Sequence, residues 1–243
     1  MKIEIKKVDE QKGILQITTL DERWYTINNE FYPSVTWIAE YYPKGIGYFK
    51  WLANKGWDEA EALKVAAGDK GSKVHQAIAL LIEGETVNID DKLTNPTTGE
   101  EEELTPEEYE CIMSFVDWHK EQKDIKYLAH EEVVYNIKYK YAGTLDIRCQ
   151  IDGQLYIIDI KTSQNIWPSH EIQLSAYYHT DNIGTPHKLA ILQVGYRRNK
   201  KKFKFTEIPD QYELFLAART IWEKEAAGIE PKQKDYPLRL SLK

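Results

Sequence analysis

Cysteine is scarce in this sequence. The 243 residues include two cysteines, Cys111 and Cys149. Two thiols are too few for a disulfide framework or for a cluster held by four thiolates. The chain also has no apolar run approaching the roughly 20 residues that a membrane-spanning helix needs, and its N-terminus lacks the apolar stretch of a signal peptide. We therefore expect a soluble protein in a reducing, cytoplasmic compartment.

An excess of positive charge is also missing. The formal net charge is -7, whereas a protein that coats nucleic acid non-specifically would be basic. A nuclease is not excluded, because acidic metal ligands add to the negative sum and phosphate contacts need only a local basic patch. A solvated turn between two strands explains the one basic cluster equally well. That cluster consists of Arg197, Arg198, Lys200, Lys201, Lys202 and Lys204.

The residues that are plentiful predict one compact domain. Hydrophobic residues make up 42% of the chain, which is enough for a full core. The first 30 residues alternate loosely and predict a small hairpin or meander. Ser34 is expected to cap a helix. Further helices are expected over 45–55, 58–67, 71–84 and 105–123, with an exposed loop over 85–104.

The second half of the chain is rich in β-strand patterns. Strands are expected over 131–137, 141–151, 154–161, 188–196 and 203–207, and helices over 168–182 and 209–227. This mixed order predicts an α/β fold, a mixed central β-sheet flanked by helices. We expect a single domain over 1–243, with an N-terminal hairpin and helical region over 1–125 and the sheet core over 126–243.

The Asp152-Gly153 pair predicts a two-residue hairpin loop between two of these strands. If Ile151 pairs with Gln154, Asp146 lies directly across from Asp159. Thr144 then lies across from Lys161. A slip by one residue would lose this opposition, so the clean apolar composition of the other face favours this register. That face collects Leu145, Ile147, Cys149, Ile151, Tyr156, Ile158 and Ile160.

A third carboxylate is expected from the preceding strand. A three-residue connection at 138–140 would place Glu132 opposite Asp146, while Glu131 remains the alternative if the connection has another length. Opposed like charges destabilise a sheet, and a divalent cation such as Mg²⁺, which prefers oxygen ligands, would compensate them. The competing interpretation is a surface cluster of carboxylates and an ammonium that is simply solvated.

These residues fall into motifs with a known order and spacing. Gly143-Thr144-Leu145-Asp146, Asp159-Ile160-Lys161-Thr162-Ser163 and Gln173-Leu174-Ser175-Ala176-Tyr177 together resemble the RecB-type exonuclease branch of the PD-(D/E)XK nuclease superfamily. Gly71-Ser72-Lys73-Val74-His75 resembles that branch's upstream helix motif, and Tyr32-Pro33-Ser34-Val35-Thr36 is similar to a segment of phage exonucleases and of the mitochondrial genome maintenance exonuclease. The superfamily's name-giving proline is Leu145 here, a common substitution in this branch.

The resemblance implies a PD-(D/E)XK (restriction-endonuclease-like) core with an N-terminal helical elaboration. It implies that Asp146, Asp159, Glu132, the Ile160 carbonyl and His75 ligate Mg²⁺ or Mn²⁺, with His75 otherwise a core histidine. Lys161 would orient or deprotonate the attacking water. Substrate or supporting contacts are implied for Gln173, Tyr177, Ser34, Thr144, Thr162 and Ser163. The four cysteines of relatives with an iron-sulfur cluster are absent, so no such cluster is expected.

The expected function is hydrolysis of DNA phosphodiester bonds by a metal-dependent exonuclease. Its expected substrate is single-stranded DNA or DNA with free ends, in replication, recombination or repair, with recombination or replication proteins as partners and a phage or bacterial source. The rival expectation is a non-catalytic nucleic-acid-binding module on the same fold. An unrelated metal-binding α/β protein is the third alternative. The complete Asp, Asp-x-Lys set favours the enzyme, because inactive copies usually lose one member.

Overall fold

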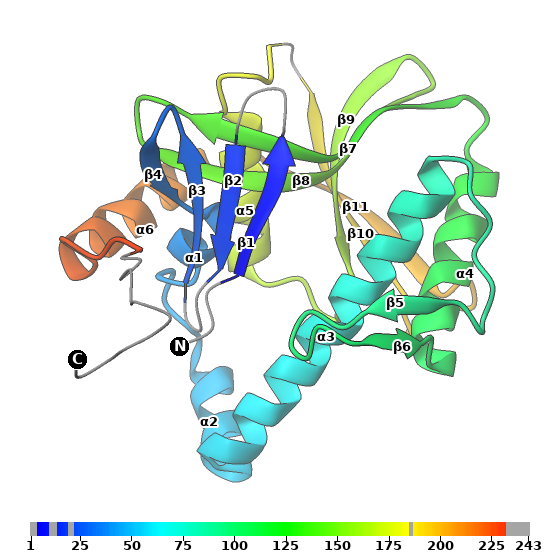
Figure 1. Cartoon of the computed structure of the whole chain (residues 1–243). Helices are drawn as coiled ribbons and strands as arrows, with labels where there is room; N and C mark the ends of the chain where they lie inside the picture. The colour runs from blue at the N-terminus through cyan, green and yellow to red at the C-terminus, as the bar shows by residue number, and fades with distance from the viewer. Residues whose placement is uncertain (1–3, 10–13, 19–21, 185–186, 232–243) are drawn as a thin grey trace, which may run out of the picture.

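A five-stranded mixed sheet forms the centre of the molecule. The computed structural model describes residues 4–9, 14–18, 22–184 and 187–231. The sheet has the order β11-β10-β9-β8-β7 (Figure 1). Its strands are β7 (Ile125–Asn136), β8 (Tyr141–Ile151), β9 (Gln154–Lys161), β10 (Lys188–Val194) and β11 (Phe203–Ile208). Strands β9 and β10 pair in parallel and the other neighbours pair antiparallel, which confirms the mixed α/β architecture.

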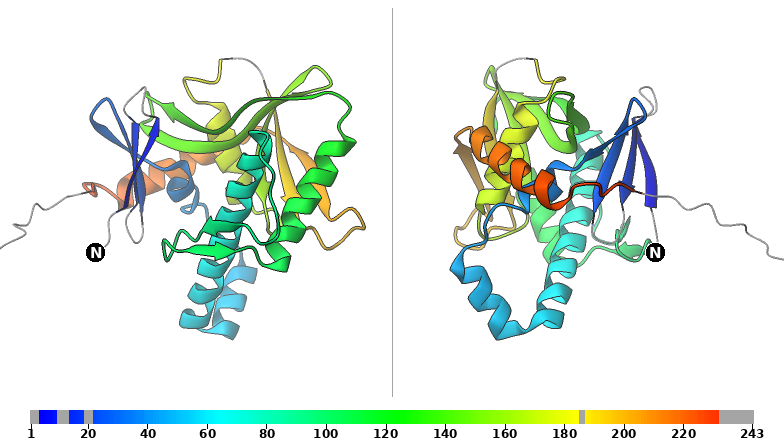
Figure 2. Two further views of the ribbon diagram at one scale, coloured as in Figure 1. Left: turned by 45° about the vertical axis from the view of Figure 1, so that its right-hand side comes forward. Right: turned by 90° about the vertical axis from the view of Figure 1, so that its left-hand side faces the viewer.

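Helices cover both faces of this sheet (Figures 1 and 2). One hydrophobic cluster joins the sheet to α1 (Val35–Ala39), α5 (Pro168–Tyr178) and α6 (Tyr212–Glu225). A second cluster joins it to α3 (Trp57–Ile82) and α4 (Pro106–Glu121). The buried side chains of these helices recur at helical spacing, for example Val74, Ala77 and Ile78 on α3, so each helix turns one apolar stripe to the sheet.

The N-terminal residues form a second, antiparallel sheet, as the alternating pattern predicted. It contains β1 (Glu4–Asp9), β2 (Ile14–Thr18), β3 (Arg23–Ile27) and β4 (Glu30–Pro33) in sequential order. Ser34 follows β4, caps α1 by accepting a hydrogen bond from the Trp37 N–H (3.1 Å), and pairs with Ala142 of β8. This link sets the small sheet against the end of β8 where the candidate residues lie.

The helical region differs from the prediction at two glycines. Residues 57–82 form one continuous α3, although separate helices were expected on either side of 68–71. Gly68 and Gly71 lie inside α3, where each costs about 1 kcal/mol relative to alanine. Packing of the helix against the sheet offsets this cost. The predicted end of the helix is confirmed, since Gly84 follows in a left-handed conformation with φ of 92°.

Two further segments complete the N-terminal half of the chain. α2 (Ile46–Lys55) precedes α3, and together they form a helical hairpin that projects from the body (Figures 1 and 2). The expected loop over 85–104 contains a short hairpin of β5 (Lys92–Thr94) and β6 (Glu101–Glu103). After it, Thr105 caps α4 through the predicted capping box with Glu108.

The Asp152-Gly153 hairpin has the predicted register. Asp152 and Gly153 have φ of 47° and 83°, as a two-residue turn of this type requires. The backbone pairs run from Ile151 with Gln154 to Ile147 with Ile158. Beyond that pair the two strands separate, so the predicted opposition of Asp146 with Asp159 and of Thr144 with Lys161 is not formed. For this reason Leu145 packs with α5 and α6, whereas Ile147 packs with α3 and α4, and the apolar face is shorter than predicted.

The register between β7 and β8 differs from the prediction by one residue. The connection contains four residues, 137–140, because Asn136 pairs with Tyr141. Glu132 consequently pairs with Leu145 and not with Asp146. The residue brought level with Asp146 is Glu131, which was the alternative. β7 also begins at Ile125, six residues before the expected strand.

Within the described part of the chain, no helix is both long and apolar enough to cross a membrane.

Candidate metal centre

Asp146 lies where β8 and β9 separate. Its Oδ2 accepts a hydrogen bond from the Ile160 backbone N–H at 2.7 Å, so the carboxylate replaces the backbone acceptor that a continued ladder would provide. This bond fixes the orientation of the carboxylate. Its other oxygen, Oδ1, lies 3.4 Å from Nδ1 of His75 on α3. Two elements far apart in the sequence thus meet at one carboxylate.

His75 and Glu131 complete a group of possible metal ligands. The Glu131 carboxylate lies 4.0 Å from His75 Nδ1, and one donor atom from each of His75, Glu131 and Asp146 falls within 4.8 Å of the others. His75 Nε2 also lies 3.1 Å from the Ile160 carbonyl oxygen. Glu131 has φ of 47°, a left-handed conformation that is uncommon for a glutamate. Such outliers concentrate at functional sites.

The predicted ligand Glu132 has another partner. Its carboxylate accepts two hydrogen bonds from the Arg148 guanidinium, at 2.8 and 3.2 Å. The four-residue connection between β7 and β8 explains the difference, because it moves Glu131 into the place that a three-residue connection would have given to Glu132. Glu132 thus forms a cross-strand ion pair, and Glu131 joins the ligand group.

Asp159, which is buried, and Lys161, which is partly buried, form an ion pair beside this group. The Asp159 side chain is 1% exposed, and Lys161 Nζ lies 2.9 Å from its Oδ1 and 2.7 Å from its Oδ2. Asp159 Oδ1 also lies 3.4 Å from Gln173 Nε2 of α5. Asp159 is therefore turned toward Lys161 and Gln173, outside the group formed by His75, Glu131 and Asp146.

The charges of the site alter one another's ionisation. Burial disfavours the imidazolium, but Asp146 and then Glu131 outweigh it and raise the pKa of His75 to about 9. Burial also disfavours the Asp146 carboxylate, yet the charge on His75 holds the pKa of Asp146 below its usual value. Burial raises the pKa of Asp159 to about 6 against the opposing effect of Lys161. On acidification Asp159 is thus protonated before Asp146.

The α5 residues Gln173 and Tyr177 form one supporting unit, as their shared helix face predicted. Gln173 Nε2 donates to the Tyr177 hydroxyl at 3.0 Å. The Tyr177 ring is buried against Gly143 of β8, where an added Cβ would lie 2.5 Å from Cε1 of the ring. Only glycine lets the ring pack this closely on the strand. Tyr177 is therefore a buried brace for Gln173, and not an exposed substrate contact.

Tyr25 is a residue that sequence reasoning missed. It lies on β3 of the small sheet, is 1% exposed, and its hydroxyl lies 3.0 Å from Thr144 Oγ1 on β8. Gln16 Nε2 donates to the same hydroxyl at 2.9 Å. No local sequence signal could have shown this contact, because it depends on how the two sheets pack.

The other predicted substrate residues have mainly structural partners. Ser34 is 2% exposed and its hydroxyl caps α1, which leaves it no surface for a substrate. Ser163 Oγ donates to the Asn165 carbonyl at 2.8 Å. Thr162 is half-buried and faces Gly71 of α3. The segment after Lys161 is held in place through Gln193, whose Nε2 donates to the Ser163 carbonyl at 2.8 Å.

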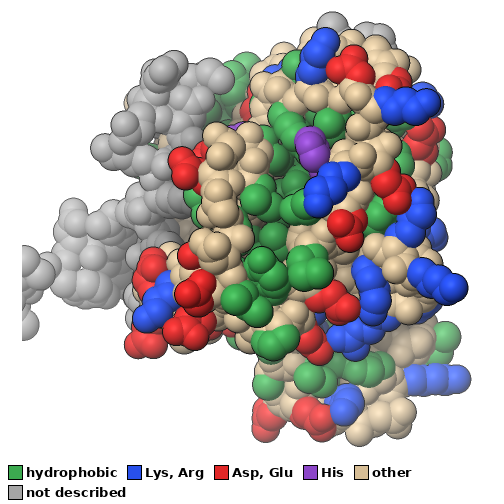
Figure 3. Space-filling model, turned by 90° about the vertical axis from the view of Figure 1, so that its right-hand side faces the viewer, with side chains coloured by type: hydrophobic (Ala, Val, Ile, Leu, Met, Phe, Trp, Pro, Cys, Tyr) green, Lys and Arg blue, Asp and Glu red, His purple; other side chains and the backbone are tan. Residues whose placement is uncertain are grey.

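Three of the six basic side chains of residues 197–204 are paired with acidic side chains of α4. Arg197 lies 2.9 Å from Glu107, Lys201 lies 2.6 Å from Glu121, and Lys202 lies 3.1 Å from Glu110. Basic and acidic side chains lie side by side on this face of the molecule (Figure 3). The pairing supports the interpretation as a solvated turn more than a continuous phosphate-binding surface.

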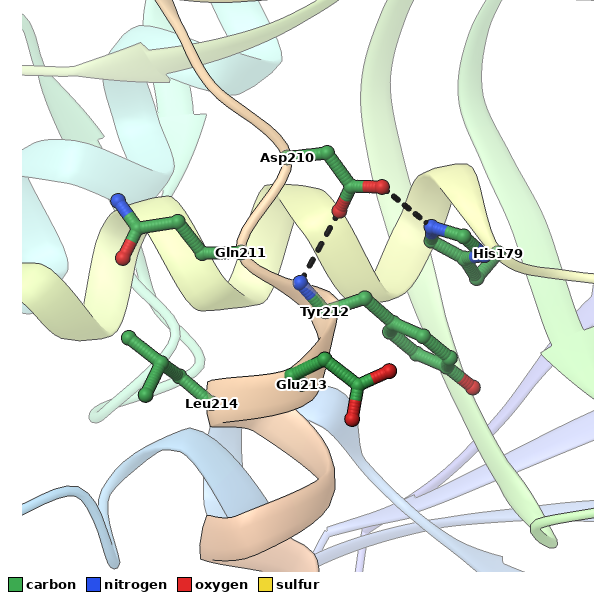
Figure 4. A pocket seen from close by; sticks show the side chains of 6 residues that line it. All are labelled: His179, Asp210, Gln211, Tyr212, Glu213 and Leu214. Carbon is green, nitrogen blue, oxygen red and sulfur yellow. Dashed lines mark hydrogen bonds and ion pairs between the residues drawn. The ribbon is translucent and has the colours of Figure 1, made fainter.

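A hollow of about 370 Å³ lies apart from these residues, at the start of α6. In it, His179 Nε2 lies 2.6 Å from Asp210 Oδ2, and the Tyr212 N–H donates to Asp210 Oδ1 at 3.0 Å (Figure 4). The His179 ring stacks on Tyr212 with centroids 4.0 Å apart. The imidazole and the carboxylate in this hollow are thus paired with each other.

The chain matches no protein-family model, and no curated protein matches it.

Proposed function

We propose that this protein is a metal-dependent nuclease that hydrolyses phosphodiester bonds of DNA, built on a PD-(D/E)XK core. The observation that carries the proposal is the convergence of His75, Glu131 and Asp146 beside the Asp159–Lys161 pair. Three carboxylates, an imidazole and an ammonium from α3, β7, β8 and β9 meet where β8 and β9 separate. This is the set that the resemblance to RecB-type exonucleases requires, with Glu131 in place of Glu132.

The donor set fits a divalent cation of the hard type. Oxygen donors from Glu131 and Asp146, with the Ile160 carbonyl close by, suit Mg²⁺ and Mn²⁺, and the single imidazole of His75 is better accepted by Mn²⁺. The resemblance adds Asp159 to these ligands. A bound cation would act as a Lewis acid on the phosphate and would lower the pKa of a water molecule.

The protein's own groups account for the remaining chemistry. The Lys161 ammonium, held by Asp159, would orient the attacking water and offset charge that develops on the phosphate. Neighbouring Asp159 and Asp146 raise the pKa of Lys161 against the opposing effect of burial, which keeps the ammonium charged at neutral pH. Gln173 and Tyr177 would hold Asp159 in place. The candidate site thus combines a charged hydrogen-bond donor, Lys161, with side chains that hold its partner Asp159 in place.

A non-catalytic DNA-binding module is the second candidate. It would conserve the fold without needing an ammonium beside a buried carboxylate. Burial of a charged group brings little stability by itself even when the group is paired, so the buried Asp159 beside the partly buried Lys161 is better explained by chemistry than by folding. This observation favours the enzyme.

Digestion of end-labelled linear and circular DNA, each single- and double-stranded, tests the proposal. Cleavage is expected with Mg²⁺ or Mn²⁺ and is expected to stop with EDTA. Loss of circular single-stranded DNA would identify an endonuclease in place of an exonuclease. No cleavage of any DNA with either ion, while DNA binding persists, would favour the binding module.

Lys161→Ala is expected to abolish cleavage while the protein still folds and binds DNA, because the loss is of transition-state stabilisation. The melting temperature should fall, since removal of the ammonium leaves Asp159 buried without its ion pair. Lys126→Ala is the matched control, because Lys126 is 65% exposed and its nearest acidic partner, Asp124, lies 4.0 Å away. Full activity of a folded Lys161→Ala protein would contradict the proposal.

A further inference from the structure

The small sheet places a buried hydroxyl beside the candidate metal centre. Tyr25 of β3 is 1% exposed, and its hydroxyl lies 3.0 Å from Thr144 Oγ1 of β8. A buried apolar cluster joins the small sheet to β7 and β8 at this point. Its members are Ile14, Tyr25, Ile27, Tyr32, Val133 and Ala142. The contact between Tyr25 and Thr144 is therefore set by how the two sheets pack.

Thr144 lies close to the carboxylates of the candidate site. It precedes Asp146 by two residues, in the part of β8 that no longer pairs with β9. Tyr25 lies in the same neighbourhood, because burial and then Tyr25 raise the pKa of the Tyr177 hydroxyl, and the carboxylates of the site raise it further. Thr144 is only half-buried, so a bound molecule can reach its side chain.

The donors and acceptors around Tyr25 fix the direction of its hydrogen bonds. Gln16 Nε2 of β2 donates to the Tyr25 hydroxyl at 2.9 Å, and an amide nitrogen cannot accept. The proton of the buried Tyr25 hydroxyl needs an acceptor of its own, since leaving a buried donor unpaired is unfavourable. Thr144 Oγ1 is the acceptor that the described residues provide. The proton of Thr144 consequently points away from Tyr25.

The Thr144 proton is left open for a ligand. Among the described residues, Tyr25 is the single hydrogen-bond partner of the Thr144 hydroxyl. An open donor beside a candidate metal centre suits a ligand with anionic oxygen atoms. The unesterified oxygens of a phosphodiester are such acceptors, and threonine hydroxyls are among the side chains that hold DNA phosphates. The chemistry of this donor thus fits a phosphate group.

We propose that the Thr144 hydroxyl donates a hydrogen bond to a phosphate of the bound DNA strand, and that Gln16 and Tyr25 are positioning residues that keep its proton turned toward the strand. The inference rests on the proposed nuclease function for the identity of the substrate. It gives the small sheet a part in substrate binding, because the Gln16 amide sets the direction of both hydrogen bonds. Without this amide, the Thr144 proton could turn to the Tyr25 oxygen and would be lost to the phosphate.

Two variants test the donor and its direction. Thr144→Val removes the hydroxyl and keeps the shape of the side chain. Gln16→Glu keeps a hydrogen bond to Tyr25 but reverses it, because a carboxylate accepts the phenol proton. The Tyr25 oxygen is then an acceptor for the Thr144 proton. A purely structural role of Gln16 would survive this change, whereas the proposed role would not.

The small sheet supplies a matched control for each kind of change. Thr26→Val makes the same substitution next to Tyr25, at a buried hydroxyl without a hydrogen-bond partner. Tyr32→Phe removes a hydroxyl from the residue that pairs with Tyr25 across the sheet. Tyr32 is also buried, at 2% exposed, and its hydroxyl forms no hydrogen bond within the described part of the chain. Melting temperatures establish that all four variants are folded.

Affinity for a labelled single strand of DNA is measured by fluorescence anisotropy in EDTA, with a series of strands in which one linkage at a time is a neutral methylphosphonate. The wild type should bind about 10- to 150-fold more weakly when the contacted linkage is neutral. Thr144→Val should bind the unmodified strand more weakly by a similar factor and should respond about tenfold less at that linkage. Gln16→Glu should also lose the response at that linkage, whereas general repulsion by its added charge would act at every linkage. Both controls should behave as the wild type.

The outcomes separate the inference from the proposed function, because cleavage is measured independently with Mn²⁺. If Thr144→Val responds to every linkage as the wild type does, Thr144 is not the donor and the inference is overturned. If Thr144→Val loses the response and Gln16→Glu keeps it, the positioning role of Gln16 and Tyr25 is overturned. If both variants lose it but the wild type cleaves no DNA, the inference stands and the nuclease proposal fails. A wild type that binds no DNA overturns both.

Discussion

Gly143 shows how a single residue without a side chain can support a charged site. The Tyr177 ring occupies the space where a Cβ of residue 143 would lie, and its hydroxyl accepts from Gln173. Gln173 in turn lies within 3.4 Å of Asp159. The glycine of the Gly143-Thr144-Leu145-Asp146 motif thus supports Asp159 indirectly. It leaves space for the Tyr177 ring, whose hydroxyl holds the Gln173 side chain near Asp159.

Gly143→Ala is therefore expected to lower the free energy of unfolding by about 1–3 kcal/mol, the usual cost of overpacking a buried contact. The added methyl would have to displace the ring of Tyr177, which is a buried residue of α5. Chemical denaturation measures the loss. Gly184→Ala is the control, since its Cβ would meet no atom within 4 Å. Equal stability of the two variants would show that the ring can move aside without cost.

At the scale of helices and strands, sequence patterns correctly predicted the features that neighbouring residues determine. The Asp152-Gly153 turn set the register of β8 and β9, and the capping box set the start of α4, because both depend on neighbouring residues. The connection between β7 and β8 has no such signal, so its predicted length was wrong by one residue. The error exchanged Glu132 for Glu131, because side chains alternate along a strand.

The continuity of α3 leads to a prediction at its two internal glycines. Gly68 has no atom within 4 Å of an added Cβ, and Gly71 has only Thr162 Oγ1 at 3.8 Å. Gly68→Ala and Gly71→Ala should each raise the free energy of unfolding by about 0.5–1 kcal/mol, since alanine is the better helix former. Denaturant midpoints of the two variants check this. A loss of stability in either would mean that the chain bends there, as two separate helices would require.

The register of β7 and β8 predicts which glutamate responds to metal. Mn²⁺ at a hundredfold excess over its Kd should stabilise the protein by about 2.7 kcal/mol if it binds only the folded state. Glu131→Gln should reduce this gain, because Glu131 lies with His75 and Asp146. Glu132→Gln should keep the gain while losing the Arg148 ion pair, which is worth about 0.2–1 kcal/mol.

Melting curves of both variants in EDTA and in excess Mn²⁺ separate the two positions. The two variants make the same Glu→Gln change at neighbouring positions of β7, so each controls for the other. A metal-induced gain that shrinks in Glu132→Gln and persists in Glu131→Gln would restore the three-residue connection and contradict the structure.

At the scale of the whole molecule, the candidate site lies where two sheets and two helices meet. The small sheet contributes Tyr25, α3 contributes His75, and α5 contributes Gln173. The sequence motifs identified the residues on β8, β9, α3 and α5 because their spacing is recognisable. Tyr25 escaped because 119 residues separate it from Thr144, and no local pattern predicts which sheets pack together.

The stability of the whole chain in acid depends in part on one histidine, His170. Burial, then the nearby Lys161 and Lys44, lowers the pKa of His170 to about 3. The folded state therefore binds this proton less readily than the unfolded state, where the pKa is about 6.5. The His170 contribution to stability is complete above pH 6.5 and is lost as the pH falls toward 3, with a slope of up to about 1.4 kcal/mol per pH unit.

His170→Gln should flatten this acid limb. Glutamine at the third position of α5 can still accept from the Trp167 N–H, as His170 Nδ1 does at 3.4 Å, but it cannot be protonated. The free energy of unfolding is measured from pH 7 to pH 4 in EDTA for both proteins. Asp159, whose pKa burial raises to about 6, acts in the opposite direction, but its contribution is common to both and cancels in the difference. The variant should gain stability relative to the wild type as the pH falls below 6.5. A difference that stays constant with pH would show that His170 binds its proton as readily in the folded protein as in the unfolded chain.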